Sequence, residues 1–397
     1  MRVAMSSVSA RSGQSLEAIA GRFHPPDQID AIDVIGSGNV NDTFLVRLVA
    51  APDAGAEDGT AFVMQRLNTD VFSRPELVMG NLIALGDHVR DRIASGMPEL
   101  RGRRWEVPTV LPTRAADAHW VEHDGQFWRS ISYIGAATTH DVVADATQAR
   151  EVGYGLGMFH HLISDLPVDR LADTLEGFHV TPAYLSRYDD VLSEWRSKGA
   201  GLSGSAEGCD PLLLEALACV ADGRTDADVL EAALARGELQ RRPIHGDPKI
   251  NNVMIDECSG QAVGLIDLDT VKPGLVHYDI GDCLRSCCNP AGEDASDLSA
   301  VHFDLGLCRA VLEGYLSVAR AFLSPADLAY VPACIRLIPF ELGLRFLTDH
   351  LEGDHYFKVS YPGHNLHRAL VQFTLMRSIE AQSEAIKALV DQLTQSP

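Results

Sequence analysis

The sequence has little basic charge for its length of 397 residues. It contains 33 Lys and Arg residues against 55 Asp and Glu residues, which gives a net charge of −22. Binding to a nucleic-acid backbone or to an anionic membrane surface needs clustered Lys and Arg side chains, so this balance argues against both kinds of partner. It does not argue against a small substrate, because a local pocket can oppose the charge of the whole chain.

The eight cysteines include no CxxC pair, which argues against a zinc ribbon or a redox motif. Cys287 and Cys288 are neighbours, an arrangement that does not suit an ordinary disulfide. We therefore expect buried, reduced thiols in a cytoplasmic protein. The N-terminal residues lack the apolar core of a signal peptide, and no uninterrupted apolar run of about 18 residues predicts a membrane span.

Two parts of the chain differ in hydrophobic periodicity. Strand-like stretches at 29–50, 61–68 and 107–134, with helices at 12–24 and 75–94, predict a small antiparallel sheet. Beyond about residue 140 helical spacing dominates, and the expected helices cover 147–166, 182–198, 212–237, 296–323, 333–351 and 364–394. The expected fold class is therefore α+β, with a sheet-rich N-terminal lobe at residues 1–135 and a larger, mostly helical C-terminal lobe at 136–397.

The segment HGDPKINN, residues 245–252, interrupts the helical part and has polar residues at spacings suited to phosphoryl transfer. Such a transfer needs alignment, charge neutralisation and a group that orients the attacking hydroxyl. Asp247 is predicted to accept the proton of that hydroxyl or hold it in line. Lys249 is predicted to reach the γ-phosphate, and the amide oxygen of Asn252 to bind Mg²⁺.

Two more carboxylates follow in IDLDT, on what the pattern indicates is the next strand, 262–271. Asp267 is predicted to hold Mg²⁺ that bridges the nucleotide phosphates. Asp269 lies two residues later, hence on the same face of that strand, and is predicted to bind a second metal ion or to support the first. The alternative is a salt-bridged acidic turn without catalytic significance.

A glycine-containing turn, IGSGNVNDTFLV, begins at residue 35. Gly36 and Gly38 permit close approach of backbone amides to a phosphate, and Asn41 and Asp42 can brace the turn through side chain–backbone bonds. A plain hairpin is the alternative. Arg66, in the following strand, is predicted to pair with the nucleotide phosphates, and its alternative is a surface arginine.

Polar residues also follow the second carboxylate motif, in HYDIGDCLRS. Here Asp282 is predicted to cap a helix and to pair with Arg285, with Asp279 in the same structural group. His160 and His161 share a predicted helix. They diverge by about 100°, so they are expected to be packing and surface residues and not a metal pair.

The pattern of residues 245–252 resembles the protein-kinase catalytic loop H-R-D-x-x-x-x-N. It keeps the His, the Asp and the spacing from Asp247 to Asn252, and Asp267 corresponds to the metal-binding Asp of D-F-G. Glycine after the His, and Asp269 two residues after Asp267, resemble the aminoglycoside and choline kinase branch. That resemblance implies a two-lobed protein-kinase-like fold, ATP and Mg²⁺ as cofactors, and Arg66 in place of the usual Lys, as in choline kinases.

Stretches from about residue 34 to residue 373 resemble one subfamily more closely, the bacterial N-acetylhexosamine 1-kinases; IDLDTVKPGL and RFLTDHLEGDHYF are the most specific. This resemblance implies phosphorylation of the anomeric hydroxyl of an N-acetylhexosamine, with sugar contacts from Arg345 and Tyr356. Asn39 stands where the subfamily has a His facing the sugar, and Gly246 where it tends to have Asn. From the residues alone, Arg345 fits an ion pair with Asp349, and Tyr356 a partly buried ring.

Other interpretations stay open. The acceptor hydroxyl could belong to an aminoglycoside, a choline-like amine or another position of a sugar. The chain could also be a nucleotide-binding regulator that has lost catalysis, although the intact Asp247, Asn252 and Asp267 set argues for an enzyme. The expected partners are a nucleotide and a small sugar, with the chain as a monomer or a homodimer.

Overall fold

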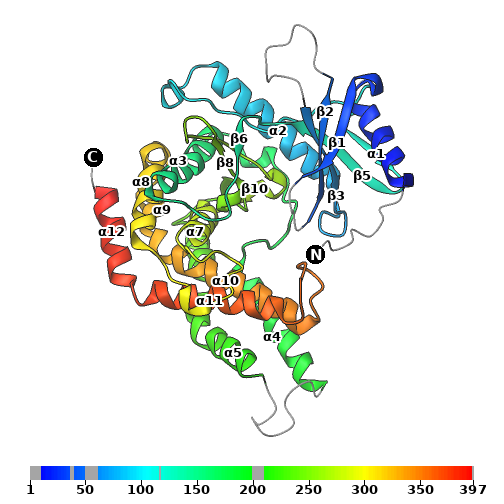
Figure 1. Cartoon of the computed structure of the whole chain (residues 1–397). Helices are drawn as coiled ribbons and strands as arrows, with labels where there is room; N and C mark the ends of the chain where they lie inside the picture. The colour runs from blue at the N-terminus through cyan, green and yellow to red at the C-terminus, as the bar shows by residue number, and fades with distance from the viewer. Residues whose placement is uncertain (1–9, 36–39, 50–60, 116–117, 199–209, 396–397) are drawn as a thin grey trace. The chain divides into compact units, whose positions relative to one another are not determined.

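The computed structural model describes residues 10–35, 40–49, 61–115, 118–198 and 210–395 (Figure 1). The chain divides into two compact units. The first, called here the sheet unit, contains Met1–Asp87 and Val107–Ala136; the second, the helical unit, contains His88–Glu106 and Ala137–Pro397. Across the described ranges, no helix is both long and apolar enough to cross a membrane.

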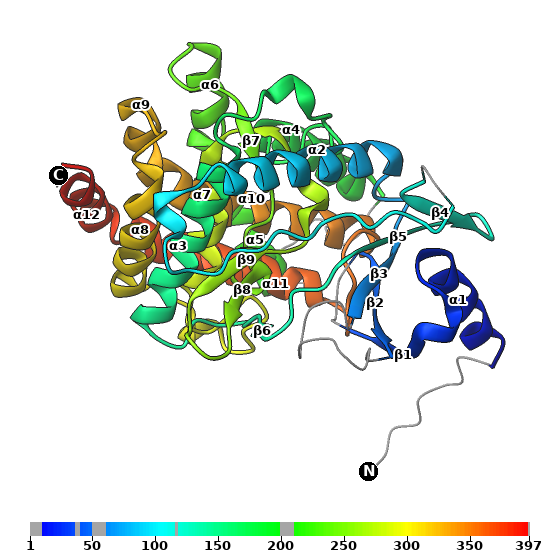
Figure 2. The same ribbon diagram turned by 90° about the horizontal axis from the view of Figure 1, so that it is seen from above.

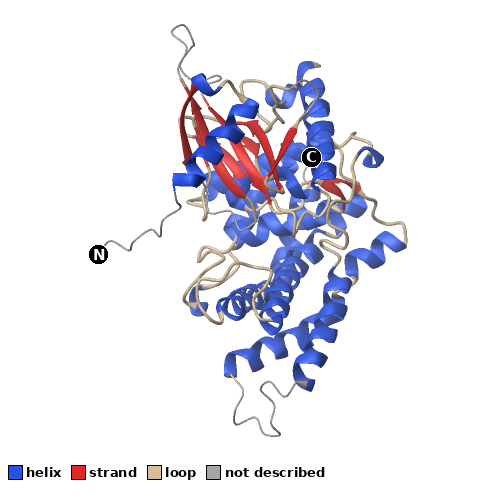
Figure 3. Ribbon diagram, turned by 90° about the vertical axis from the view of Figure 1, so that its right-hand side faces the viewer, coloured by secondary structure: helices blue, strands red, loops and turns tan. Residues whose placement is uncertain are grey.

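One antiparallel sheet forms the sheet unit (Figure 3), with the strand order β1-β2-β3-β5-β4. The strands are β1 (Ile29–Val34), β2 (Asp42–Leu48), β3 (Ala61–Leu67), β4 (Trp120–His123) and β5 (Gln126–Ser132). Helix α1 (Ala10–Phe23) lies against one face of this sheet (Figure 2). There Ile19, Ala20 and Phe23 pack on Phe62 and Met64 of β3, so the alternating side chains of that strand meet the apolar face of the helix.

The expected strand at the start of 107–134 is largely wrong. Within residues 107–113, Val110 makes an isolated bridge to Ile131 and the rest is irregular. Pro108 and Pro112 lack a backbone N–H, so this stretch cannot make a continuous ladder. The later strands β4 and β5 form as expected.

Helices make up most of the helical unit, and α2 (Pro75–Ala94) runs into it from the sheet unit. The remaining helices are α3 (Ala146–Ile163), α4 (Thr181–Ser197), α5 (Pro211–Gly223), α6 (Val229–Ala235), α7 (Val276–Cys287), α8 (Leu305–Ala319), α9 (Pro325–Ala329), α10 (Val331–Glu352), α11 (His364–Glu380) and α12 (Ser383–Gln395). Helices α3 and α8 pack side by side (Figure 1). Gly153 and Gly314 allow this approach, because a Cβ on either would lie 1.9 Å from a carbonyl oxygen of the other helix.

Two expected helices have different limits in the structure. The helix predicted over 296–323 begins only at Leu305, where the carboxylate of Asp304 accepts a bond from the N–H of Leu307 (2.9 Å). The helix predicted over 364–394 is two helices, α11 and α12. Between them, the side-chain amide of Gln382 donates to the carbonyl of Phe303 (2.9 Å), a tertiary contact that periodicity does not reveal.

Two small antiparallel sheets carry the polar segments of the helical unit. Strands β6 (Ala137–Thr138), β8 (Val253–Asp256) and β9 (Ala262–Leu265) form one sheet, and β7 (Arg242–Ile244) and β10 (Lys272–Gly274) form the other. Because the end of β7 pairs with the start of β10 and the start of β8 pairs with the end of β9, the two connections between them must lie side by side. These connections are residues 245–252 and 266–271, the two polar motifs of the sequence.

Buried thiols were expected, and six of the cysteines confirm this. Cys219, Cys283, Cys287, Cys288, Cys308 and Cys334 are buried free thiols, whereas Cys258 is exposed. The expectation is therefore wrong for Cys258, which lies in the turn between β8 and β9.

Candidate active site

The loop of residues 245–252, called here the catalytic loop, is tied to the neighbouring turn by His245. This residue is fully buried, and its Nε2 lies 3.0 Å from the carbonyl oxygen of Ile266. Its Nδ1 accepts a bond from the N–H of Asp247 (3.2 Å). One nitrogen donates and the other accepts, so the ring is neutral, and burial accordingly lowers the pKa of His245.

Asp279 of α7 binds the backbone at the beginning of the catalytic loop. Its carboxylate accepts bonds from the N–H of His245 (2.7 Å) and the N–H of Gly246 (2.8 Å), and it lies 2.8 Å from Nε2 of His160. Burial opposes the charge of Asp279, but the bonds from His160 and the loop outweigh it, so its pKa is lowered. His160 was expected to be a packing residue; it also orients this carboxylate.

The structural role expected for Asp282 is half right. Its carboxylate accepts a bond from Nε of Arg285 (2.8 Å), which confirms the predicted pair. The predicted cap is wrong, because α7 begins at Val276 and Asp282 lies inside the helix. Arg285 also binds Glu293 (2.8 Å), so it links α7 to the segment that follows it.

Asp247, the predicted proton acceptor, lies at the open part of the catalytic loop, with 32% of its side chain exposed. Nδ2 of Asn252 donates to the backbone carbonyl of Asp247 (2.7 Å) and to its Oδ2 (3.2 Å). Nζ of Lys249 lies 3.5 Å from the same Oδ2. Burial raises the pKa of Asp247 and Lys249 offsets part of the rise. The carboxylate is thus a stronger base than an ordinary aspartate.

Lys249 stays a cation in this setting. The charge of Asp247 raises its pKa most, and Asp267 adds a smaller contribution in the same direction. The three residues are therefore electrostatic neighbours, as the two sequence motifs required. A fixed positive charge beside the carboxylate of Asp247 suits the neutralisation of a phosphate.

The two carboxylates of IDLDT do not share a strand face, so that expectation is wrong. Strand β9 ends at Leu265, and Asp267 has a left-handed backbone with φ 61° that begins the 3-10 turn Leu268–Thr270. Asp267 is consequently exposed, whereas Asp269 is 2% exposed. A turn of this kind directs neighbouring carboxylates to different sides, one toward solvent and one into the protein.

The oxygen donors on these two segments fit Mg²⁺. Because the amide nitrogen of Asn252 faces Asp247, its amide oxygen is directed away and can accept a cation. Asn252 and the exposed Asp267 thus carry hard-oxygen donors, the kind that Mg²⁺ prefers when phosphates supply further ligands, whereas the carboxylate of Asp269 is buried on the other side of the turn. Within the described ranges, no group of three or more His, Cys, Asp and Glu side chains is arranged to hold a metal by itself.

Arg345 of α10 does not lie on the helix surface as an ion-pair partner. The centre of its guanidinium group is 5.0 Å from the ring centre of Phe178, 5.2 Å from that of Tyr184 and 5.5 Å from that of Phe357. Burial opposes its charge, but Tyr184 and, with smaller contributions, Tyr356, Glu341 and Asp247 outweigh this and raise its pKa.

The expected Arg345–Asp349 ion pair is absent from the described part of the chain, because the carboxylate of Asp349 binds backbone groups instead. Its carboxylate accepts bonds from the backbone N–H groups of His355 (2.9 Å), Tyr356 (2.7 Å) and Phe357 (2.9 Å). This fixes the loop after α10 and presents Tyr356, which is 52% exposed, with its ring edge-on to Phe357. This agrees with the partly buried ring that the residues alone suggested.

The residues expected to bind the nucleotide belong to the sheet unit. Gly36, Gly38 and Asn39 lie outside the described residues. Arg66 lies near the end of β3, where it forms an ion pair with Asp42, and 43% of each side chain is exposed. The side-chain oxygen of Asn41 accepts a bond from the N–H of Asn68 (3.0 Å), so it ties the start of β2 to the segment after β3, and the expected brace within the glycine turn stays a prediction.

Two residues that grip the catalytic loop have no signal in the sequence. The hydroxyl of Thr270 donates to the carbonyl of His245 (2.8 Å), and Nε2 of His179 lies 2.6 Å from the carbonyl oxygen of Gly246. Thr270 is the last residue of IDLDT, but nothing in the spacing of that motif assigns its hydroxyl to the carbonyl of His245. His179 is 67 residues from its partner and belongs to no motif.

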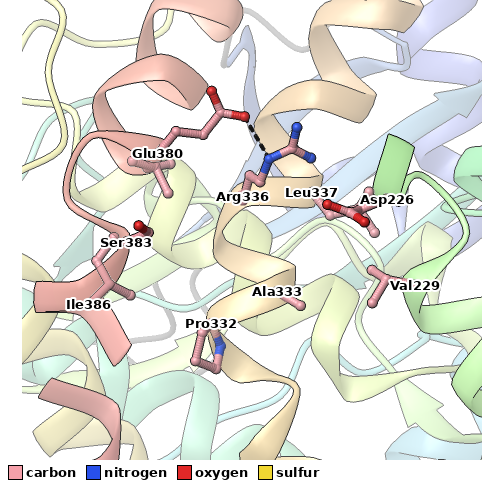
Figure 4. A pocket seen from close by; sticks show the side chains of 10 residues that line it. Asp226, Val229, Pro332, Ala333, Arg336, Leu337, Glu380, Ser383 and Ile386 are labelled. Carbon is pink, nitrogen blue, oxygen red and sulfur yellow. Dashed lines mark hydrogen bonds and ion pairs between the residues drawn. The ribbon is translucent and has the colours of Figure 1, made fainter. Parts of the chain in front are cut away.

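A pocket of about 290 Å³ lies elsewhere in the helical unit (Figure 4). Its lining comes mainly from α10, α11 and α12 and includes Pro332, Leu337 and Ile386, with the Arg336–Glu380 ion pair (2.7 Å) at its edge. None of the expected site residues lines it, so the chemistry expected from the sequence does not belong to this pocket.

The family model of the phosphotransferase enzyme family matches residues 97–319, more than half of the chain. The chain belongs to this family. The matched region contains the catalytic loop and the turn with Asp267, so the recognition of an aminoglycoside and choline kinase-like phosphotransferase is confirmed.

Solved structures share the fold of this phosphotransferase at low sequence identity. An aminoglycoside phosphotransferase from Alicyclobacillus acidocaldarius is 14% identical with a TM-score of 0.61, over 98% of each chain. A choline kinase from Cryptosporidium parvum is 14% identical with a TM-score of 0.56, over 96% of this chain and 100% of that chain. A microcompartment-associated aminopropanol kinase is 15% identical with a TM-score of 0.53, over 94% and 98%. The expected α+β, kinase-like fold class is confirmed.

Proposed function

We propose that this phosphotransferase transfers the γ-phosphoryl group of ATP, with Mg²⁺, to the anomeric hydroxyl of an N-acetylhexosamine or a related sugar. The single observation that favours a sugar over the other acceptors is the position of the Arg345 guanidinium group among three aromatic rings. The family supplies the reaction class, and the residues of the helical unit supply the reasons for the acceptor.

The catalytic step follows from the groups beside Asp247. The acceptor oxygen attacks the γ-phosphorus, the bond from that phosphorus to the bridging oxygen breaks, and ADP leaves with the bond electrons. The hydroxyl proton passes to Asp247, whose raised pKa favours its acceptance. The cation of Lys249, 3.5 Å from this carboxylate, offsets the charge of the transferred group.

Asn252 and Asp267 would hold Mg²⁺, and the ion would neutralise phosphate charge; the buried Asp269 would act as a supporting group. The proposed nucleotide contacts of Gly36, Gly38 and Arg66, and a sugar contact of Asn39, rest on the sequence patterns alone. Arg66 is already paired with Asp42, so a phosphate would replace a partner whose contribution at an exposed site is small.

The surroundings of Arg345 argue against a cationic acceptor. Aromatic faces that cage an ammonium group are a common device, but the faces of Phe178, Tyr184 and Phe357 are occupied by a guanidinium group. A choline-like amine or an aminoglycoside would add positive charge beside a fixed cation. Within the described part of the chain the guanidinium forms no hydrogen bond, so its N–H groups suit the hydroxyl and acyl oxygens of a neutral sugar.

The decisive experiment measures ADP release with a panel of acceptors. The panel contains N-acetylglucosamine, N-acetylgalactosamine, their unacetylated parents, choline, ethanolamine and an aminoglycoside. We expect turnover with the N-acetylated sugars, and phosphorus NMR of the product should show a 1-phosphate. Turnover only with the amines, or a 6-phosphate product, would overturn the sugar 1-kinase proposal, and no turnover with nucleotide still bound would favour a regulator.

A variant of Arg345 tests the acceptor directly. Arg345→Gln should raise the KM for the sugar about 10- to 100-fold, because an oriented charged donor is lost, and leave the nucleotide KM within about twofold. Arg187→Gln is the matched control, since Arg187 pairs with Glu352 at an exposed site. An equal effect of both variants on sugar KM would remove Arg345 from the sugar site.

A further inference from the structure

His179 lies in a buried position between the catalytic loop and α10. Its Nδ1 is 2.8 Å from Oε1 of Glu341, and its Nε2 is 2.6 Å from the carbonyl oxygen of Gly246. The Gly246 carbonyl can only accept, and an ionised Glu341 carboxylate can only accept as well. A neutral imidazole has a single N–H, so beside an ionised Glu341 only the doubly protonated ring can donate to both. The geometry therefore favours a buried imidazolium ion paired with the Glu341 carboxylate.

The groups that surround His179 support its charge. Glu341 of α10 supplies the counter-charge and also accepts a bond from the hydroxyl of Thr181 (2.8 Å). Tyr278 of α7 stacks on the ring with centroids 5.2 Å apart. Burial lowers the pKa of His179 and so does Arg345, but the charge of Glu341 and the two hydrogen bonds outweigh them, so the pKa is raised.

The carbonyl that His179 holds belongs to the peptide bond between Gly246 and Asp247. The N–H at the other end of this peptide bond donates to His245 (3.2 Å), and the N–H of Gly246 itself is held by Asp279. Gly246 has φ 89°, and a Cβ there would lie 2.7 Å from the carbonyl oxygen of Thr270, so the loop is packed tightly on its other side. The plane of this peptide bond sets the direction in which the Asp247 side chain leaves the backbone.

We infer that His179, charged and held by Glu341, is a positioning residue that locks the peptide plane ahead of Asp247 and thereby orients the reacting carboxylate. The inference rests on the proposed role of Asp247 as proton acceptor. Loss of the proton removes one of the two bonds and lets the Gly246 carbonyl turn. Phosphoryl transfer should therefore weaken on the alkaline side through this lock, independently of the acceptor.

Glu341→Gln is the informative variant, because it removes the counter-charge but keeps the size and an acceptor oxygen. The raised pKa means that the charged form of His179 is present at low pH and is lost as pH rises through the folded value. Without the carboxylate this loss should occur at lower pH. We expect the alkaline limb of kcat to move down by about one pH unit or more, with nucleotide KM within about twofold.

Glu352→Gln is the matched control, since Glu352 is on the same helix and pairs with Arg187 at an exposed site. Its pH profile should coincide with that of the wild type. A folded Glu341→Gln protein with an unshifted alkaline limb would overturn the inference. His179→Gln, which keeps one donor for the carbonyl, should retain at least tenfold more kcat than His179→Ala, and equal losses would contradict positioning by the hydrogen bond.

A measurement on the wild-type chain is independent of turnover and of the acceptor. In nitrogen NMR of histidine-labelled protein, the ring signals of His179, assigned by their absence in His179→Gln, should show two protonated nitrogens at pH 7. A ring with one unprotonated nitrogen would overturn the inference, even if the variants of Glu341 do not fold. Failure of the sugar panel alone leaves these ring signals unchanged, so the two proposals fail separately.

Discussion

The charged side chains of the catalytic loop, in the helical unit, and of Arg66, in the sheet unit, are held in place in different ways. Arg66 is paired with one partner, Asp42, and both side chains are 43% exposed. The catalytic loop is held through its backbone by two buried groups, Asp279 and His179, and by the partly buried hydroxyl of Thr270. Exposed pairs contribute little, whereas removal of one partner from a buried network leaves unsatisfied polar groups.

This difference separates a rigidly held loop from an adjustable contact. The position of Asp247 is determined by groups that cannot move without a loss of stability, so its geometry is set before any substrate binds. Arg66 can exchange Asp42 for another anion at little cost. Substitutions in the catalytic loop, or in the residues that bind its backbone, should therefore have large effects on turnover or stability. Substitutions in the exposed pair should have small effects on stability.

The largest effect is expected at the reacting group. Asp247→Asn removes the proton acceptor but keeps the size of the side chain, so kcat should fall about 10³-fold or more while nucleotide still binds. Steady-state kinetics and a nucleotide titration check this. Asp228→Asn is the control, because Asp228 is exposed and its side chain makes no capping hydrogen bond to α6. Turnover near that of the wild type would reject Asp247 as the reacting group.

A large loss of stability is expected at Asp279, which binds the backbone of the catalytic loop. Asp279→Asn places an amide N–H against donors from His245, Gly246 or His160, so it should lower the free energy of unfolding by about 3 kcal/mol. Urea unfolding at pH 7 measures this. The folded pKa of Asp279 is lowered, so its contribution exists above the unfolded pKa and is lost as pH falls through the folded one.

The difference in the free energy of unfolding between the wild type and Asp279→Asn should consequently become smaller as the pH falls. Asp297→Asn provides the comparison, because Asp297 is an exposed helix cap and asparagine caps nearly as well. If the two variants lose similar stability at pH 7, the buried network beneath the loop is not what distinguishes the two regions.

A pair of glycine variants should give a medium effect. Gly246→Ala and Gly260→Ala both place alanine at positive φ, 89° and 69°. Only at Gly246 does the added Cβ meet a backbone oxygen, that of Thr270 at 2.7 Å. We expect a loss of about 3 kcal/mol at Gly246 against about 1 kcal/mol at Gly260, measured by thermal or urea unfolding. Equal losses would show that the loop relaxes easily.

The smallest effect is expected at the exposed pair. Asp42→Asn should change the free energy of unfolding by less than about 0.5 kcal/mol, and the change should shrink further in high salt. Arg66→Gln should be equally mild for stability but should raise the nucleotide KM if the proposed phosphate contact is right. A large loss of stability from Asp42→Asn would erase the contrast between the two regions.

Predictability from the sequence differed between local and distant contacts. Helix α2 begins and ends where periodicity placed it, at 75–94, because its apolar residues and its first proline act locally. The irregular stretch at 107–113 and the break between α11 and α12 depend on prolines in a partly paired segment and on a contact of Gln382 with Phe303. The prolines are visible in the sequence but leave the apolar alternation unchanged, whereas the contact of Gln382 with Phe303 exists only in the folded chain.

The candidate site shows the same division. The spacing of Asp247, Lys249 and Asn252 predicted a shared site, and the structure brings them together. The relation of Asp267 to Asp269 was wrong, because the left-handed backbone at Asp267 turns the chain just after the strand. Asp282 was assigned a cap that the helix does not use, since sequence spacing does not reveal where a helix begins.

The sequence by itself determined the reaction class, because phosphoryl transfer requires particular side chains at particular spacings within two short segments. Only the tertiary structure decided which groups hold those segments, namely Asp279 and the His179–Glu341 pair, and that Arg345 lies among aromatic rings. The physical reason is that the reactive side chains of a loop are close neighbours in the sequence, so their types and spacing can be read from it. The rigidity of the loop comes from hydrogen bonds to partners on helices far away along the chain, and those bonds exist only once the chain has folded.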